Sequence, residues 1–304
     1  MSRLLIIDGH AIIHRAYYSM PPLTSNGQPV NAIYGFYSML LAALDTLSPK
    51  YLLVCLDSPG PTFRSQEFIG YRAKRKIPDQ SLIAQLPLLK SSLVDASIPN
   101  LSMGGFEADD LIATATQKLS PKAKLDKVLI VTGDKDLMQL VDNKTHLIMP
   151  LRGLSQTQEI NPSFVKDKLG VVPGQVVDLK ALMGDMSDNY PGVAGIGPKT
   201  ASDLLVQYHT LDNIYANLGS LKPSLAQKLE AEKDNAYLSQ KLATLINNIP
   251  LDIRLRNYRI TKNQIRGLES IFKFYNFKSL LARLKKIFPK EFYKSNSSNQ
   301  KSLF

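Results

Sequence analysis

Three short apolar runs in the first half of the chain each end close to an acidic residue. The runs are residues 4–7, 51–56 and 128–131, and the acidic residues that follow them are Asp8, Asp57 and Asp134. Runs of this kind predict buried strands, and the segments 32–47 and 82–94 between them have helical patterns. Strands that alternate with helices favour a parallel α/β sheet. Because ligands bind outside the carboxyl ends of such strands, the three aspartates are predicted to lie on one rim.

Six further acidic residues fall into compact groups along the sequence. They are Glu107, Asp109 and Asp110, then Asp136 beside Asp134, then Asp185 and Asp188. Hard divalent cations prefer oxygen ligands, and two ions about 4 Å apart can activate water in phosphodiester hydrolysis. So many carboxylates on one rim would repel each other strongly without cations. The pattern therefore predicts a centre that holds two or more divalent ions.

Each acidic group also has a simpler explanation when taken alone. Glu107, Asp109 and Asp110 begin a helical pattern, where acidic residues complement the helix dipole. Asp134 could cap a helix that starts at Lys135, and Asp8 with Gly9 could form a turn. Asp185 and Asp188 could be ordinary loop residues. The joint placement of all nine on one predicted rim favours the metal centre.

Other chemistries have little support in the sequence. The four histidines and the single Cys55 do not have the spacing of zinc ligands, and Cys55 lies in an apolar run that predicts burial. Neither a GxxxxGK[ST] phosphate loop nor a GxSxG elbow is present. The apolar start of the chain is interrupted at Asp8, unlike a secretory signal or a membrane span. We expect a cytoplasmic protein without a membrane partner.

Charge and one long connection point to nucleic acid. Residues 253–304 contain 13 Lys and Arg and two acidic residues, whereas residues 1–252 contain 24 of each sign, so the C-terminal portion carries the net charge of +11. Such a portion suits a polyanion, although a solvated helical face explains it as well. Between residues 59 and 78, Tyr71 stands among the cations Arg72, Lys74, Arg75 and Lys76. This combination suits single-stranded nucleic acid, and a solvated basic loop is the alternative.

From about residue 161 the pattern changes to short helices, at 173–182, 198–208 and 235–246. Gly192, Gly195 and Gly197 precede Pro198 and Lys199, at the start of the second of these. Glycines let a backbone approach a phosphate closely, a helix start offers free N–H groups, and a lysine adds charge. The pattern is typical of a helix–hairpin–helix that grips a DNA backbone, and a plain tight turn is the alternative.

These motifs together resemble the 5′-nuclease domain of bacterial DNA polymerase I and its stand-alone relatives, within the flap-endonuclease superfamily. The resemblance runs from residue 3 to about residue 284. It depends on the segments 8–17, 63–64, 71–75, 107–110, 132–136 and 182–189. It implies an α/β fold with a PIN-like sheet core flanked by helices, a helical arch at 60–80 and a helix–hairpin–helix portion. We expect a nuclease core at 1–160, a helical DNA-binding portion at 161–284 and a basic, polar tail at 285–304.

The resemblance also implies roles for individual residues. The core metal site would be formed by Asp8, Asp57, Glu107, Asp109, Asp134 and Asp136, with Asp110, Asp185 and Asp188 either completing it or supporting its ligands from the surrounding layer. In the arch, Arg72, Lys74 and Arg75 would act on the scissile phosphate, although Arg72 stands where a lysine is more usual. Tyr71, Gly192, Gly195, Gly197 and Lys199 would bind DNA. The implied ions are Mg²⁺ or Mn²⁺, two or more of them, and K⁺ at the hairpin.

The activity implied is that of a structure-specific 5′→3′ exonuclease and flap endonuclease in primer removal and repair. Its partners would be DNA with a 5′ flap or junction, an RNA primer strand and a separate DNA polymerase, and the protein would be a monomer. Two alternatives stay open. A PIN-type ribonuclease could share the acidic rim, although the hairpin and the Asp185/Asp188 loop count against it. A non-catalytic junction-binding protein predicts missing carboxylates, and none is missing.

Overall fold

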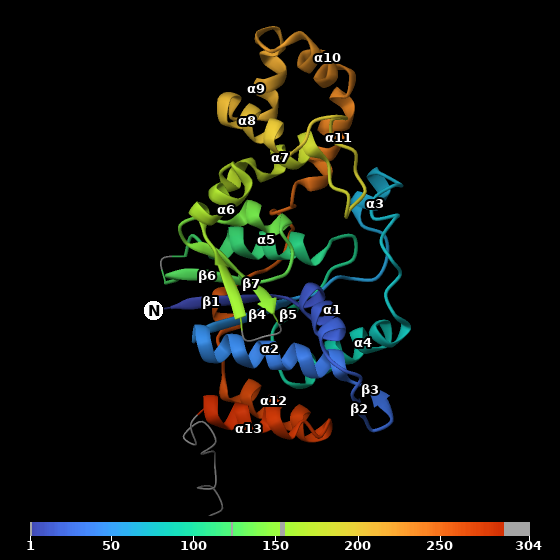
Figure 1. The fold of residues 1–304 in the computed structure, drawn as a ribbon. Helices are drawn as coiled ribbons and strands as arrows, with labels where there is room; N and C mark the ends of the chain where they lie inside the picture. The colour runs from blue at the N-terminus through green and yellow to red at the C-terminus, as the bar shows by residue number, and fades with distance from the viewer. Residues whose placement is uncertain (1, 123, 153–155, 289–304) are drawn as a thin grey trace, which may run out of the picture.

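A six-stranded sheet forms the centre of the computed structural model, which describes residues 2–122, 124–152 and 156–288 (Figure 1). The strand order is β5-β4-β1-β6-β7-β8, with β7 and β8 antiparallel and every other pair parallel. The strands are β1 (Arg3–Asp8), β4 (Tyr51–Cys55), β5 (Asn100–Leu101), β6 (Lys127–Val131), β7 (Thr145–Arg152) and β8 (Gln156–Ile160). A separate two-stranded hairpin consists of β2 (Thr24–Ser25) and β3 (Gln28–Pro29).

Helices cover both faces of this sheet because its strands are apolar on both sides. On β1, Leu5 and Ile7 belong to one core, and Leu4 and Ile6 belong to the other. The first core is completed by α1 (Gly9–Ser19), α2 (Asn31–Leu47), α4 (Gln80–Asp95), α12 (Lys262–Phe274) and α13 (Lys278–Ile287). The second is completed by α5 (Ala108–Leu119), η1 (Asp136–Leu140), α6 (Pro162–Leu169) and η4 (Leu255–Tyr258), and it includes the buried Cys55, as predicted.

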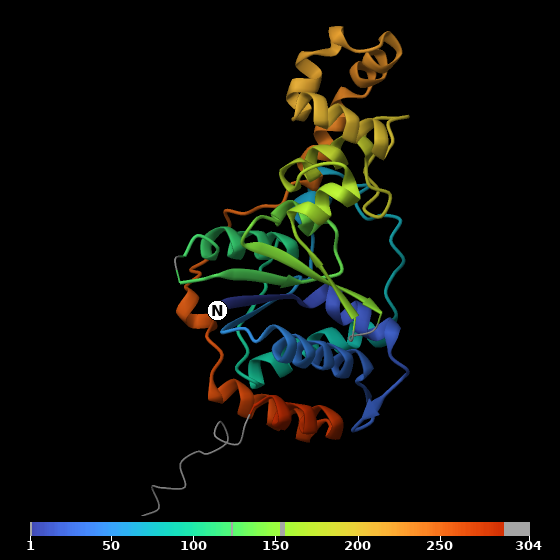
Figure 2. The same ribbon diagram turned by 60° about the vertical axis from the view of Figure 1, so that its left-hand side comes forward.

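A third core lies in a helical module that extends from one side of the sheet (Figures 1 and 2). It is built from η2 (Pro173–Gln175), α7 (Val176–Met183), α8 (Pro198–Tyr208), α9 (Leu211–Ala216), η3 (Leu218–Ser220), α10 (Pro223–Ala231) and α11 (Lys233–Ala243). The connection 184–197 between α7 and α8 contains the three glycines of the hairpin predicted at 192–199, whose last two residues begin α8. The chain then returns past the sheet to α12 and α13.

The predicted strands and most predicted helices are confirmed. The helices predicted at 32–47, 82–94 and 198–208 correspond to α2, α4 and α8. The domain boundaries predicted for the C-terminal part, a helical DNA-binding portion at 161–284 and a tail at 285–304, differ from the structure. Helices α12 and α13 pack against α2 and α4, on the far side of the sheet from the helical module, because their apolar faces complete the first core. The predicted tail boundary at 285 falls inside α13, and residues 289–304 of that tail lie outside the described residues.

The predicted helical arch at 60–80 is a strap with little helix. Only α3 (Phe63–Glu67) is helical, and consecutive turns follow it up to residue 75. Two features exclude a continuous helix. Arg72 has a φ of 57°, in the left-handed region. Its backbone N–H donates to Asp188 O at 2.8 Å instead of to a carbonyl of the same segment. We call residues 60–79 the strap. In Figure 1 it runs from α3 beside the helical module to α4 below the sheet.

Within the part of the chain that the structure describes, no helix is both long and apolar enough to cross a membrane.

Candidate metal centre and nucleic-acid interface

The carboxyl ends of β1, β4 and β6 bring the predicted aspartates to one edge of the sheet. Asp8 ends β1 and caps α1, accepting from Ala11 N at 3.0 Å and from Thr132 Oγ1 at 2.6 Å. Here a pocket of about 520 Å³ opens. Its lining includes Asp8, Asp57, Asp109 and Asp134, with His10 and His14 from α1 and Arg72, Arg75 and Lys76 from the strap. The structure therefore assembles four of the nine predicted carboxylates around one cavity.

Asp8 and Asp109 are buried, Asp57 and Asp134 are half-buried, and the four like charges repel one another. Burial, with a further contribution from the charge of Asp134, raises the pKa of Asp8 to about 7. The same two causes raise the pKa of Asp109 well above its ordinary value. Such a set of hard oxygen donors fits Mg²⁺ or Mn²⁺, because a divalent cation removes the repulsion. Among the residues with described positions, however, no three acidic, histidine or cysteine side chains form a ready-made cage.

A second pocket, of about 780 Å³, adjoins the first through Asp134 and is also lined by Asp136 and Asp185. The ammonium of Lys180, on α7, bonds to both of these carboxylates and lies 2.5 Å from Asp185 Oδ2. Burial opposes the ionisation of Asp185, but hydrogen bonds from Lys180 and Ser187 outweigh it and lower the pKa to about 2. The sequence interpretation missed Lys180. Its only signal was one lysine on a helix that ends just before Asp185.

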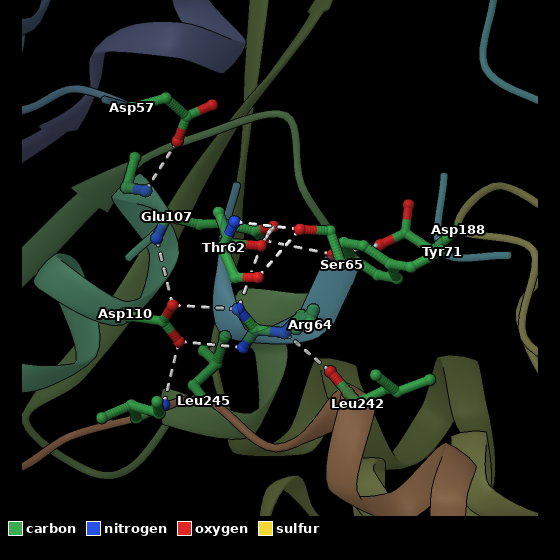
Figure 3. Close-up of polar contacts among 12 residues, drawn as sticks. Asp57, Thr62, Arg64, Ser65, Tyr71, Glu107, Asp110, Asp188, Leu242 and Leu245 are labelled. Atoms are coloured by element: carbon green, nitrogen blue, oxygen red, sulfur yellow. Dashed lines mark hydrogen bonds and ion pairs between the residues drawn. The ribbon is translucent and has the colours of Figure 1, made fainter. Parts of the chain in front are cut away.

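Asp110 does not face either pocket. Its carboxylate accepts two bonds from Arg64, at 2.8 and 2.9 Å, and one each from the backbone N–H groups of Glu107 and Ile246 (Figure 3). These four donors use the four lone-pair positions of a carboxylate. The prediction of Asp110 as a metal ligand is therefore corrected: it supports the start of α5, where Glu107 is the N-cap.

The strap contacts the remaining two carboxylates directly. Arg72 Nη1 lies 3.1 Å from Glu107 Oε1, and Arg75 Nη2 bonds to Asp188. The Tyr71 hydroxyl lies 3.1 Å from an oxygen of each of these two acids. Glu107 and Asp188 are thus bound to strap side chains, next to the pocket that Arg72 and Arg75 help to line.

Two strap predictions need correction. Tyr71 was expected to stack on nucleic-acid bases, but its ring is buried against Tyr190 and Leu242, and its hydroxyl bonds to the acids. It is therefore not accessible to a base. Lys74 is exposed and does not line the acidic pocket, whereas Lys76, which was not predicted to act on the scissile phosphate, does.

The hairpin glycines divide into two kinds. Gly192 has a φ of 64°, and a Cβ on it would lie 2.2 Å from the backbone nitrogen of Gly184. It is buried and its N–H donates to Ser239 Oγ at 3.0 Å, so it closes the hairpin and cannot contact DNA. Gly195, Gly197 and Lys199 are exposed. Gly197 is the N-cap of α8, with Pro198 at its first turn, which leaves free N–H groups facing solvent.

Residues 3–170 match the family model of the 5′-3′ exonuclease N-terminal, resolvase-like domain, and residues 171–266 match that of the 5′-3′ exonuclease C-terminal SAM fold. The chain belongs to the 5′-3′ exonuclease family. A 5′-3′ exonuclease from Aquifex aeolicus is 36% identical over 100% of both chains, and one from Bacillus subtilis is 32% identical over 92% of this chain and 99% of its own.

DNA polymerase I of Caldicellulosiruptor bescii is 40% identical over 93% of this chain, which spans about a third of the length of that relative. Among solved structures, a zinc-bound T5 5′-exonuclease aligns with a TM-score of 0.67 at 21% identity, covering 94% of this chain and 98% of its own. The catalytic core of Rad2 with DNA aligns at 0.62 and 15%, covering 94% and 92%. At these identities the structures show a shared fold, which confirms the predicted α/β, PIN-like class.

Proposed function

We propose that this protein hydrolyses DNA phosphodiesters near a junction between a 5′ single strand and a duplex, as a 5′→3′ exonuclease and flap endonuclease. The observation that carries the proposal is the edge of the sheet, where buried aspartates with raised pKa values line a cavity beside strap cations. Without bound cations, the protonated, neutral form of these carboxyl groups would have the lower free energy. A site of this composition is suited to divalent ions and a phosphate together.

The proposed ion ligands are the carboxylates that line the two pockets. They are Asp8, Asp57, Asp109 and Asp134 in the first, and Asp134, Asp136 and Asp185 in the second. Two or more Mg²⁺ or Mn²⁺ ions bound there would supply an activated water and would neutralise the charge of the reacting phosphate. Glu107 and Asp188, now bonded to the strap, would complete the set.

The chain's own cations have the complementary task. Arg72, Arg75 and Lys76 line the first pocket and would orient the phosphate, with Lys74 contacting the strand outside it. Water adds to phosphorus, the bond to the 3′ oxygen breaks, and that oxygen takes up a proton. The products are a 5′-phosphate and a 3′-hydroxyl.

The hairpin would hold the duplex. Gly195, Gly197 and Lys199 present exposed backbone and charge, and Lys228 approaches the same turn: its Nζ lies 3.0 Å from the position of a Cβ on Gly195. This arrangement suits phosphate contacts without base recognition. A K⁺ ion bound by the hairpin carbonyls belongs to the same proposal, as do primer removal in the cytoplasm by a monomer, an RNA primer strand and a separate polymerase.

The test uses a flap DNA labelled at its 5′ end, with Mg²⁺ or with EDTA, and the variant Asp134→Asn. Asp134 is chosen because it lines both pockets. We expect Mg²⁺-dependent cutting near the junction by the wild type and a loss of at least about 100-fold in the variant. Tight junction binding without cutting in either Mg²⁺ or Mn²⁺ would leave a binding protein in place of a nuclease.

A further inference from the structure

Arg64 is a buried cation with every donor in use. It is 1% exposed, and its guanidinium lies 4.4 Å from the ring centroid of Phe63. Its five N–H donors bond to Asp110 Oδ1 and Oδ2, Glu107 Oε2, Leu242 O and Thr244 O, at 2.8, 2.9, 3.3, 2.8 and 3.0 Å. Figure 3 shows this fork between the start of α5 and the Leu242 carbonyl. Apolar residues would often serve stability as well as such an ion pair, so its geometry calls for another reason.

The acceptors of Arg64 come from two distant parts of the chain. Glu107 and Asp110 begin α5, beside the acidic pocket, whereas Leu242 and Thr244 lie at the end of α11 in the helical module. Arg64 itself belongs to α3, at the base of the strap. The Arg64 side chain therefore joins three parts of the molecule: the acidic edge of the sheet, the strap and the helical module.

The end of α11 and the residues that follow it, 242–246, are held to the acidic edge of the sheet at five consecutive residues. Arg64 binds the carbonyls of residues 242 and 244, and Gln139 Nε2 binds the carbonyl of residue 243 at 3.0 Å. The N–H of residue 245 donates to Gln139 Oε1, and that of residue 246 to Asp110. Gln139 lies on η1, three residues after the pocket residue Asp136, which begins that element. The Asp110 carboxylate and the Gln139 amide thus hold this segment against the elements that form the pocket walls.

Helix α11 also carries the glycine hairpin. Ser239 accepts the N–H of Gly192 at 3.0 Å, and Gln240 Nε2 bonds to Asp178, on α7, at 2.6 Å. Ser239 and Leu242 are three residues apart, less than one turn of a helix. A displacement at the Arg64 end is therefore passed directly to the hairpin.

We infer that Arg64 is a positioning residue that sets the register between the hairpin and the carboxylates, and thereby selects the phosphodiester that is cut. The inference rests on the proposed function. Phosphates of one strand are spaced about 3.4 Å along a duplex, so a shift of a few ångströms presents the neighbouring bond. A misplacement of about 1 Å can cost about 100-fold in rate. The buried fork holds that register where a flexible contact would not.

Three variants test the register. Arg64→Lys keeps the charge but loses the planar fork. Arg64→Met with Asp110→Leu replaces the buried pair by apolar groups, so that no charge is left unpaired. Gln139→Met removes the uncharged anchor of the same segment and keeps the test decisive if both charge variants fail to fold. The matched control is Lys241→Met, because Lys241 and Glu67 join α11 to α3 at 2.7 Å on the exposed surface.

The measurement is the position of cutting on 5′-labelled flap DNA with Mg²⁺, resolved to single nucleotides at equal extents of reaction. Junction affinity in Ca²⁺ and melting temperature are measured beside it. We expect the folded Arg64 variants to spread their products over neighbouring phosphodiesters and to lose about 100-fold in kcat, with junction affinity nearly unchanged. Gln139→Met should spread its products and lower kcat in the same way, but to a smaller extent. Lys241→Met should give the wild-type product.

An unstable but correctly registered enzyme would behave differently. It would cut at the wild-type position with a lower yield, and that result in the folded variants would overturn the positioning role while leaving the nuclease intact. If the wild type itself does not cut with Mg²⁺, the proposed function fails, and the register inference fails with it.

Discussion

Without divalent ions, the free energy of unfolding should fall as pH rises from 5 to 7. Asp8 and Asp136 each have a pKa of about 7 in the folded protein, against an ordinary value of 3.8. Burial is the first cause for both, and repulsion from Asp134 adds to it. In this range the folded state therefore keeps protons that the unfolded chain has already released, and its stability declines as pH rises through the folded pKa of about 7.

The size of the effect follows from the proton balance. Each net proton changes stability by about 1.4 kcal/mol per pH unit. The two carboxyls act in one direction. Burial lowers the pKa of His14 to about 4, so that this imidazole acts in the opposite direction below its ordinary value of 6.5, more weakly because it is partly solvated. At least one net proton remains, which gives a loss of about 2 to 3 kcal/mol from pH 5 to 7. The melting temperature should fall by roughly 5 °C.

The assay is thermal and urea unfolding at pH 5, 6, 7 and 8, with EDTA and with millimolar Mg²⁺. Bound ions favour the ionised carboxylates, so Mg²⁺ should remove the decline and raise stability most at pH 7 and above. A melting temperature that stays flat or rises with pH in EDTA would refute the reasoning. It would show that the carboxylates are already ionised at pH 5 and are neutralised by the chain's own cations.

Two further perturbations separate structural from chemical roles. Gly192→Ala should destabilise the protein by more than about 2 kcal/mol and weaken duplex binding, because a Cβ cannot fit at the hairpin crossing. Gly197→Ala is its control, with no atom within 4 Å and no positive φ, and equal losses in urea unfolding would contradict this assignment. Lys180→Met should lower the melting temperature more in EDTA than in Mg²⁺, since its ammonium neutralises two carboxylates only until a divalent ion does so. The same loss in both buffers would mean that Lys180 serves packing alone.

Several features were predictable because neighbouring residues determine them. The apolar runs that end at Asp8, Asp57 and Asp134 predicted parallel strands, and the geometry of such a sheet brings their carboxyl ends to one edge. The helical start at Glu107 and the glycine-rich turn before Pro198 were also readable, because capping and turn preferences act over a few residues.

Other features depend on partners far away in the sequence. The local sequence predicts that Tyr71 is an exposed aromatic among cations. Its hydroxyl instead bonds to Glu107 and Asp188, which are 36 and 117 residues away, and the ring is buried. Asp110 reads as a ligand beside Asp109, yet it faces Arg64. The strap reads as a helical arch, yet its backbone bonds to the loop at Asp188. No local pattern contains these partners.

The sequence by itself determined the sheet, its acidic edge and the glycine hairpin, because strand periodicity, strand ends and turn chemistry are local properties. Only the tertiary structure decided which carboxylates face the pockets, which glycine is closed off inside the hairpin, and that α12 and α13 cover the far face of the sheet. The physical reason is that a buried charge or apolar face takes the partner that satisfies it, and that partner is chosen by packing across the whole chain.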